Sequence, residues 1–182
     1  NDKLSDIKKE RKNTYEWIQC FIFALIFCVV LFVFFIRVID VRGTSMVPSL
    51  KDGDKMLVSG FAYTPKVGDI VVFKKDEYDP NKALVKRIIA VEGQTINIDF
   101  ERGIVYVDGE AIQEDYINDI TLNKIDFIGP KTIPDGHVFV MGDNRNMSND
   151  SRDSRIGMVD SRLILGKAYM IIYPFNRFEF IK

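Results

Sequence analysis

The sequence predicts a mainly β protein that follows a single membrane-spanning helix. Two observations carry this prediction. Residues 17–36 contain no charged side chain and are dense in Phe, Ile, Val and Leu. After them the chain changes to short apolar or alternating runs, rich in β-branched residues and separated by turn signals, which is typical of an all-β domain. The 182 residues are enough for one domain of ordinary size with a real core.

Residues 17–36 match the roughly 20 residues that span a hydrocarbon core about 30 Å thick. Trp17 suits one membrane interface, and Arg37 closes the other end. The basic residues within 1–16 predict a cytoplasmic N terminus, with residues 37–182 on the extracytoplasmic face of the cell membrane. The alternative is a cleaved secretory signal. The apolar run is too long for a signal core of about 7–15 residues, so we expect an uncleaved anchor.

The strands of the β domain are expected in short runs bounded by Gly, Pro, Asp and Asn. Asp108-Gly109 is a strong tight-turn signal within this series. Residues 115–135 have weaker periodicity and several acids, which indicates a long loop or excursion. The expected strands are 55–58, 69–73, 83–91, 95–99, 103–107, 110–112, 137–141 and 163–173.

Composition excludes several kinds of site. The 25 basic and 26 acidic residues give a net charge of -1, which makes no general case for nucleic-acid binding. Both cysteines, Cys20 and Cys28, lie within the apolar segment, so the β domain has no thiol nucleophile, thiolate metal site or disulfide. His137 is the single histidine, which rules out a multi-histidine site. We expect no metal and no cofactor.

Ser45 is the candidate nucleophile. It lies in Gly43-Thr44-Ser45-Met46-Val47-Pro48, where Gly43 permits unusual backbone angles. Pro48 fixes its own φ and pushes Val47 away from helical angles, so this stretch is a turn close to the end of the anchor. The alternative is an ordinary turn serine.

The serine needs a base, and Lys86 is a better candidate than His137. His137 begins a strand with no acid to orient its ring. Lys86 and Arg87 are adjacent in an apolar strand, so their side chains face opposite ways and one should lie among apolar residues. A buried lysine has a lowered pKa and can act as a base, which arginine cannot. The alternative is an edge-strand lysine that discourages aggregation.

Residues 141–155 alternate Asp, Asn, Ser and Arg directly after a strand. A solvated loop is the default reading of such a stretch. The same composition suits a crosslinked polar network that fixes a site. Asp143, Asn144 and Asp150 do not fit a calcium-binding EF-hand, because no Glu closes a twelve-residue loop.

Together these stretches resemble the type I signal (leader) peptidases, which are membrane-bound Ser/Lys endopeptidases. The resemblance covers most of the chain in the right order, and the short chain with one anchor is similar to the Gram-positive form. It implies an all-β catalytic domain with a small second β region, expected at 93–135. The matching stretches behind the anchor are Ser45-Met46-Val47-Pro48, Gly68-Asp69-Ile70-Val71-Val72-Phe73, Val85-Lys86-Arg87-Ile88, and Gly142-Asp143-Asn144-Arg145 through Arg152.

The resemblance implies roles for particular residues. Ser45 would be the nucleophile, Lys86 the general base and then the acid, and Ser148 would orient the lysine ammonium. Gly43 stands where some relatives have an oxyanion-stabilising serine, so only its backbone remains as a contributor. Four charged residues would brace the site: Asp143, Arg145, Asp150 and Arg152. Shallow substrate pockets would be lined by Val41, Met46, Leu50, Leu84 and Val85.

The implied activity is removal of N-terminal signal peptides from secreted preproteins, with a cut after Ala-x-Ala-like sites. The substrate would bind extended, as an added strand. The implied partners are these preproteins and the lipid bilayer, with function as a monomer. A self-cleaving Ser/Lys repressor protease shares the implied fold but lacks an anchor. A non-catalytic membrane-tethered β domain and an inactive signal-peptidase paralogue are the remaining alternatives.

Overall fold

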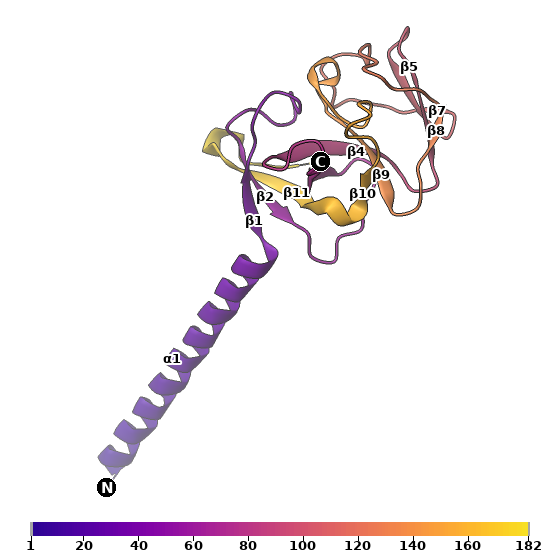
Figure 1. Cartoon of the computed structure of the whole chain (residues 1–182). Coiled ribbons are helices and arrows are strands. Elements are labelled where there is room, and N and C mark those ends of the chain that lie inside the picture. The colour runs from indigo at the N-terminus through magenta and orange to yellow at the C-terminus, as the bar shows by residue number, and fades with distance from the viewer. Residues whose placement is uncertain (1, 182) are drawn as a thin grey trace. The chain divides into compact units, whose positions relative to one another are not determined.

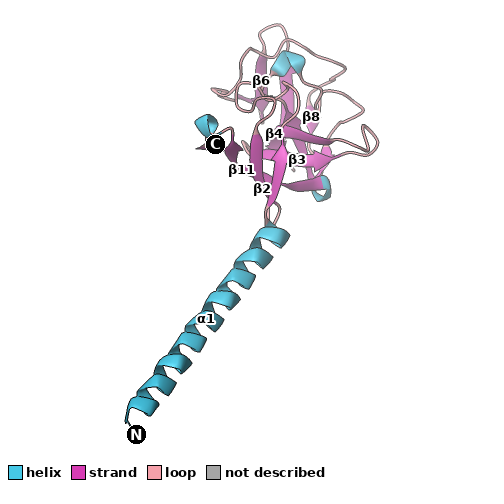
Figure 2. Ribbon diagram, turned by 90° about the vertical axis from the view of Figure 1, so that its left-hand side faces the viewer, coloured by secondary structure: helices cyan, strands magenta, loops and turns pink. Residues whose placement is uncertain are grey.

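The computed structural model describes residues 2–181, and the side chains of residues 13–30 and 35–181. The chain divides into two compact units, Asn1–Arg37 and Val38–Lys182. The first is a long helix, and the second contains, over its described residues, strands and loops with only three short 3-10 turns. Figure 2 shows this contrast, with short helical turns only among the strands of the second unit.

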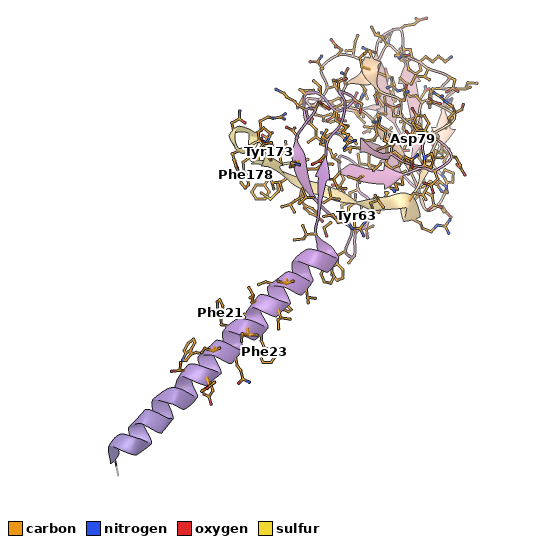
Figure 3. The ribbon with its side chains drawn as sticks, turned by 60° about the vertical axis from the view of Figure 1, so that its left-hand side comes forward. Phe21, Phe23, Tyr63, Asp79, Tyr173 and Phe178 are labelled. Carbon is orange, nitrogen blue, oxygen red and sulfur yellow. The ribbon has the colours of Figure 1, made fainter. Side chains whose placement is uncertain are left out.

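Helix α1 runs from Asp2 to Phe35. It begins well before the apolar run because residues 2–16 contain no Pro or Gly to interrupt it. By length and composition, residues 13–30 of this helix are able to cross a membrane. Trp17, Phe21 and Phe23 each expose more than half of their surface, and Figure 3 shows Phe21 and Phe23 projecting from the helix. An apolar surface of this kind is suited to lipid rather than to water.

The second unit contains two antiparallel sheets (Figure 1). The larger has the strand order β1-β2-β11-β3-β4-β9-β10, with β12 paired to β11. Its strands are β1 (Arg37–Asp40), β2 (Lys55–Ser59), β3 (Ile70–Lys74), β4 (Ala83–Val91), β9 (His137–Met141), β10 (Val159–Asp160), β11 (Ile164–Tyr173) and β12 (Glu179–Phe180). The 3-10 turns are η1 (Arg145–Met147), η2 (Ser161–Leu163) and η3 (Phe175–Arg177).

The smaller sheet has four strands in the order β7-β6-β5-β8. Figure 1 shows β5, β7 and β8 grouped at one end of the β-structure, beyond β4 and β9. The strands are β5 (Thr95–Asp99), β6 (Ile104–Val107), β7 (Glu110–Ala111) and β8 (Lys131–Thr132). The long segment between β7 and β8 leaves the smaller sheet and contacts residues of the larger sheet and of the loop after β9. Glu114 pairs with Arg145, and Tyr116 lies against Arg87.

The prediction of a mainly β fold is confirmed. Every strand expected from the sequence is present with bounds within one residue of those expected. Four strands were not expected, namely β1, β8, β10 and β12. They have two to four residues each, which is too short for side-chain alternation to be visible in the sequence.

Strand β4 belongs to all three parts of the hydrophobic core. Leu84 and Ile88 pack with residues of β3, β9 and β10. Ile89 and Ala90 pack beneath the smaller sheet, while Val85 packs on the cluster that includes Met46. Because β4 pairs with β3 on one side and β9 on the other, its middle residues are held firmly in place.

Candidate active site

The turn that carries Ser45 is fixed by hydrogen bonds from two separate segments. The backbone N–H of Val41 donates to the Asp54 carbonyl at 2.7 Å, which ties the start of the turn to the loop before β2. Asn144 secures the other side. Its backbone N–H donates to the Ser45 carbonyl at 3.0 Å, and its side-chain amide donates to the Thr44 carbonyl at 3.1 Å.

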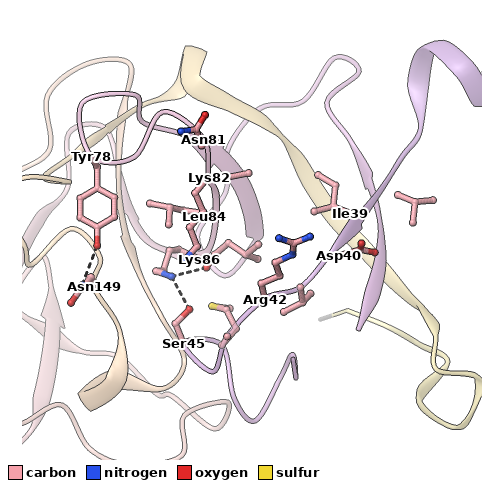
Figure 4. Close-up of a pocket in the computed structure, with 16 residues that line it drawn as sticks. Ile39, Asp40, Arg42, Ser45, Tyr78, Asn81, Lys82, Leu84, Lys86 and Asn149 are labelled. Carbon is pink, nitrogen blue, oxygen red and sulfur yellow. Dashed lines mark hydrogen bonds between the residues drawn. The ribbon is translucent and has the colours of Figure 1, made fainter. Parts of the chain in front are cut away.

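Strand β4 brings Lys86 to this turn. The Nζ of Lys86 lies 2.9 Å from the Oγ of Ser45, and it also donates to the Val85 carbonyl at 3.0 Å (Figure 4). Only 3% of Lys86 is exposed. The structure therefore brings together the two residues that the sequence pointed to as nucleophile and base.

Burial changes the acid–base behaviour of Lys86. The loss of solvation lowers the pKa of its amine from 10.5 to about 8. The carboxylates of Asp150 and Asp143 oppose this change, while the positive charges of Lys82 and Arg152 add to it. A substantial fraction of Lys86 is thus neutral slightly above physiological pH, and a neutral amine can take a proton from an alcohol.

Arg87 is buried on the opposite face of β4, although the sequence argument required only one of the two basic residues to be buried. Its Nε and Nη2 donate to the two carboxylate oxygens of Asp143, at 2.9 and 2.8 Å. A further donor reaches the Gly68 carbonyl at 2.7 Å. Sequence reasoning did not assign Arg87 to the site, because the position of its partner 56 residues later depends on the β4–β9 pairing.

Asp150 and Arg152 form a second buried pair. The Nε and Nη2 of Arg152 donate to the Asp150 carboxylate at 2.8 and 2.9 Å. The same carboxylate accepts from the Gly142 backbone N–H at 3.0 Å, and Arg152 also donates to the Arg145 carbonyl at 2.6 Å. These bonds fold residues 142–152 into a closed loop against the end of β9.

Arg145 is fully buried and connects this loop to the segment after β7. Its guanidinium forms an ion pair with Glu114 and donates to the Thr121 hydroxyl at 2.9 Å. The ring of Tyr116 faces both Arg87 and Arg145, with 4.1 and 5.9 Å between ring centre and guanidinium carbon. Residues 115–135 have weaker periodicity in the sequence, and no role for Glu114 or Tyr116 was predicted from it.

Ser148 and Gly142 pack directly beside the Ser45 turn. The Oγ of Ser148 is buried and has no hydrogen-bond partner among the described residues. A Cβ atom on Gly142 would lie 2.3 Å from that Oγ and 2.4 Å from the Ser45 carbonyl oxygen. Glycine is therefore required at 142 for the loop to approach the nucleophile.

A hollow of about 520 Å³ opens at Ser45 and Lys86 (Figure 4). Four of the residues expected to contact substrate lie in its lining, namely Val41, Met46, Leu84 and Val85. Leu50, expected with them, is instead fully buried in the core cluster that contains Val41 and Met46. It can influence the hollow only by packing behind the lining.

Gly43 and His137 are two other residues that were considered from the sequence. The backbone N–H of Gly43 donates to the Asp52 carboxylate at 2.7 Å, so this donor is already occupied. Gly43 has a φ of +86°, a conformation that favours glycine. His137 begins β9 and pairs with Asp160, whereas the site adjoins Met141 at the far end of that strand.

Comparisons with known proteins show the family of the chain. A family model described as signal peptidase, peptidase S26, matches residues 14–173. The chain belongs to this family. It is accordingly a type I signal peptidase, a class of serine endopeptidase. The family assignment confirms the resemblance seen in the sequence.

Several named relatives are similar over most of the chain. A probable signal peptidase I-1 from Synechocystis is 40% identical over 146 residues, covering 75% of this chain and 71% of the relative. A signal peptidase I from Bacillus licheniformis is 30% identical over 177 residues, covering 92% of each. A signal peptidase I crystal structure from Enterococcus faecalis is 28% identical, with a TM-score of 0.46 over 58% of this chain and 97% of that one.

Proposed function

We propose that this protein removes N-terminal signal peptides from secreted preproteins through a Ser45–Lys86 dyad. The observation that carries the proposal is the 2.9 Å approach of a buried lysine amine to a serine hydroxyl at the edge of an open hollow. An alcohol is a poor nucleophile at neutral pH unless a neighbouring base takes its proton. Lys86 has both the position and the lowered pKa for this task.

The reaction follows from these two groups. Neutral Lys86 takes the Ser45 proton as Oγ attacks the carbonyl carbon of the scissile bond. The tetrahedral intermediate collapses to an acyl-enzyme as the Lys86 ammonium returns the proton to the leaving amine. A water molecule then attacks the ester, again losing a proton to Lys86, and Ser45 is released with its hydroxyl restored.

The surrounding loop supports both charge states of the dyad. We assign the backbone N–H of Ser45 to the oxyanion that forms on the substrate carbonyl. The unpartnered Ser148 hydroxyl is assigned to accept a hydrogen bond from the Lys86 ammonium when it forms. Asp143, Arg145, Asp150 and Arg152 are assigned to hold residues 142–152 in place through their buried ion pairs.

The lining of the hollow supports a preference for small residues. Val41, Met46 and Leu84 are buried apolar side chains that leave room for alanine and reject larger groups by overlap. We call these three apolar side chains the floor of the hollow. An extended chain turns alternate side chains to one face, so the residues one and three positions before the cut both face this floor. This supports cleavage after Ala-x-Ala-like sequences.

The membrane arrangement is part of the same proposal. Residues 17–36 anchor the chain in the cell membrane, residues 1–16 lie in the cytoplasm, and residues 37–182 form the extracytoplasmic catalytic domain with residues 93–135 as its smaller β region. The support is an N-terminal helix that is able to cross a membrane and the basic residues that precede the apolar run. We propose that the protein acts on preproteins as a monomer.

The test compares wild type, Ser45→Ala and Lys86→Ala as full chains in detergent. Each is incubated with a preprotein that carries an Ala-x-Ala site, and the products are weighed by mass spectrometry. We expect cleavage after the second alanine by wild type alone. Cleavage by Lys86→Ala would exclude the dyad. Folded wild type that cuts nothing would instead indicate a tethered β domain without catalysis or an inactive paralogue.

A further inference from the structure

The rim of the hollow carries two cations that take no part in the proton transfers of the proposed mechanism, although Lys82 contributes to the lowered pKa of Lys86. Arg42 precedes the Ser45 turn and Lys82 precedes β4, and both line the hollow while remaining exposed to solvent. Figure 4 shows both among the side chains that line the hollow, near Leu84 and Lys86. A chain bound in the hollow is therefore exposed to the charge of both cations.

The negative charge of the rim is already compensated. Asp40 is the one carboxylate in the lining, and it accepts a hydrogen bond from Lys55 at 2.7 Å. This partner holds the pKa of Asp40 below its ordinary value. The charge of Arg42 adds to this effect on Asp40, but among the described residues no hydrogen bond or ion pair joins the side chain of Arg42 or Lys82 to an acid. The rim therefore presents net positive charge.

An extended substrate directs one particular side chain toward this rim. Successive side chains of a strand point to opposite faces. When the residues one and three positions before the cut face the floor, the residue between them faces the rim. We propose that Arg42 and Lys82 form a subsite that favours an acidic side chain two positions before the cut. This inference rests on the proposed function.

The expected preference is modest because the cations are exposed. Ion pairs between exposed groups are weak and are screened by salt. We expect each cation to change the ratio of kcat/KM between acidic and basic substrates by about two- to fivefold at low salt, with a smaller ratio at high salt. A repelled lysine at this position adds to the difference.

The experiment uses three peptides that differ only in the middle residue of the site: Ala-Glu-Ala, Ala-Gln-Ala and Ala-Lys-Ala. The full chain in detergent is assayed for kcat/KM at low and high salt. Wild type is expected to prefer Glu over Gln and Gln over Lys. Arg42→Gln and Lys82→Gln should each lower the ratio of kcat/KM between the Glu and Lys peptides. Arg42→Glu should lower this ratio further or bring it below one.

Arg102→Gln is the matched control. Arg102 is 75% exposed, lies in the turn between β5 and β6, and is not in the lining of the hollow. The substitution removes one positive charge, as Arg42→Gln does, and should leave the order of kcat/KM among the three peptides unchanged. An equal effect from Arg102→Gln would mean that overall charge decides the preference, which overturns the subsite.

The outcomes separate this inference from the proposed function. Equal kcat/KM for all three peptides in wild type overturns the subsite and leaves the peptidase intact. A Glu preference that survives in the Arg42→Gln, Lys82→Gln double variant overturns the assignment to these residues. Failure of folded wild type to cut the neutral peptide overturns the proposed function, and the subsite with it.

Discussion

The guanidinium of Arg87 donates two parallel hydrogen bonds to the carboxylate of Asp143, across 56 positions of sequence and on the face of β4 opposite Lys86. Arg87 is 4% exposed and Asp143 is fully buried. Adjacent residues of one strand thus have different tasks. Lys86 reaches the nucleophile, and Arg87 ties the strand to the loop that surrounds it.

Removing one charge of this pair should be costly. Asp143→Asn leaves the Arg87 guanidinium buried without a counter-charge, which we expect to lower the free energy of unfolding by about 3 kcal/mol. Urea unfolding of the full chain in detergent measures this. Asp160→Asn is the control, because Asp160 pairs with Arg162, which is 89% exposed, and the loss of this pair should lower the free energy of unfolding much less. Equal losses in the two variants would contradict the role of burial.

The pH–rate profile should report the lowered pKa of Lys86. Because only the neutral amine is a base, kcat/KM should rise tenfold per pH unit below an inflection at about 8. The measurement is kcat/KM for an Ala-x-Ala peptide between pH 6 and 11. An inflection near 10.5 would show that Lys86 is solvated or that another group limits the rate.

The same burial should cost the protein stability at neutral pH. The pKa of Lys86 falls from 10.5 to about 8 on folding, so the unfolded chain binds more protons between these values and stability rises with pH across this window. Lys86→Met should therefore abolish cleavage and raise the free energy of unfolding by on the order of 3 kcal/mol at pH 7, with a smaller gain at pH 10.

Denaturant unfolding at the two pH values tests this relationship. Lys51→Met is the control, because Lys51 is exposed and its replacement should give no pH-dependent gain. If Lys86→Met raises the free energy of unfolding by the same amount at pH 7 and pH 10, the gain comes from packing alone and not from the removal of a buried charge.

Gly142→Ala should disable the site without removing a reactive group. The new methyl would lie 2.3 Å from the Ser148 Oγ and 2.4 Å from the Ser45 carbonyl oxygen, so the nucleophile turn must move. We expect kcat to fall at least about 100-fold, as a displacement of about 1 Å at a reacting centre does. Gly93→Ala is the control, since a Cβ on Gly93 would meet open space; its φ of +80° adds a backbone strain that Gly142→Ala does not carry. A near-wild-type kcat for Gly142→Ala would mean that the loop accommodates the methyl group without displacing Ser45.

Much of the β-structure was predictable because local sequence patterns indicate the longer strands. The longer strands alternate or run apolar between Gly, Pro and Asp, and the structure places them within one residue of expectation. Lys86 was predictable for a similar reason. A lysine beside an arginine in an apolar strand must turn toward one face or the other.

The bracing of the site was less predictable because its partners are distant in sequence. Arg145 pairs with Glu114, and Tyr116 lies beside Arg87, in a segment that was expected to be only a long loop. Nothing in the spacing of these residues encodes the contact, which depends on how the segment after β7 returns to the larger sheet. Leu50 shows the same limit, because an apolar residue near a pocket can either line it or support it from behind.

The position of β11 has a consequence for how the enzyme matures. Strands β2 and β3 are neighbours in sequence, but β11 pairs between them. During synthesis the two earlier strands must therefore wait for residues 164–173 before either can complete its pairing. The larger sheet cannot assemble vectorially as the chain emerges, and a nascent chain that lacks this last long strand has no finished support for its nucleophile. The sheet that supports the nucleophile is thus completed only when β11 has joined the strands that precede it.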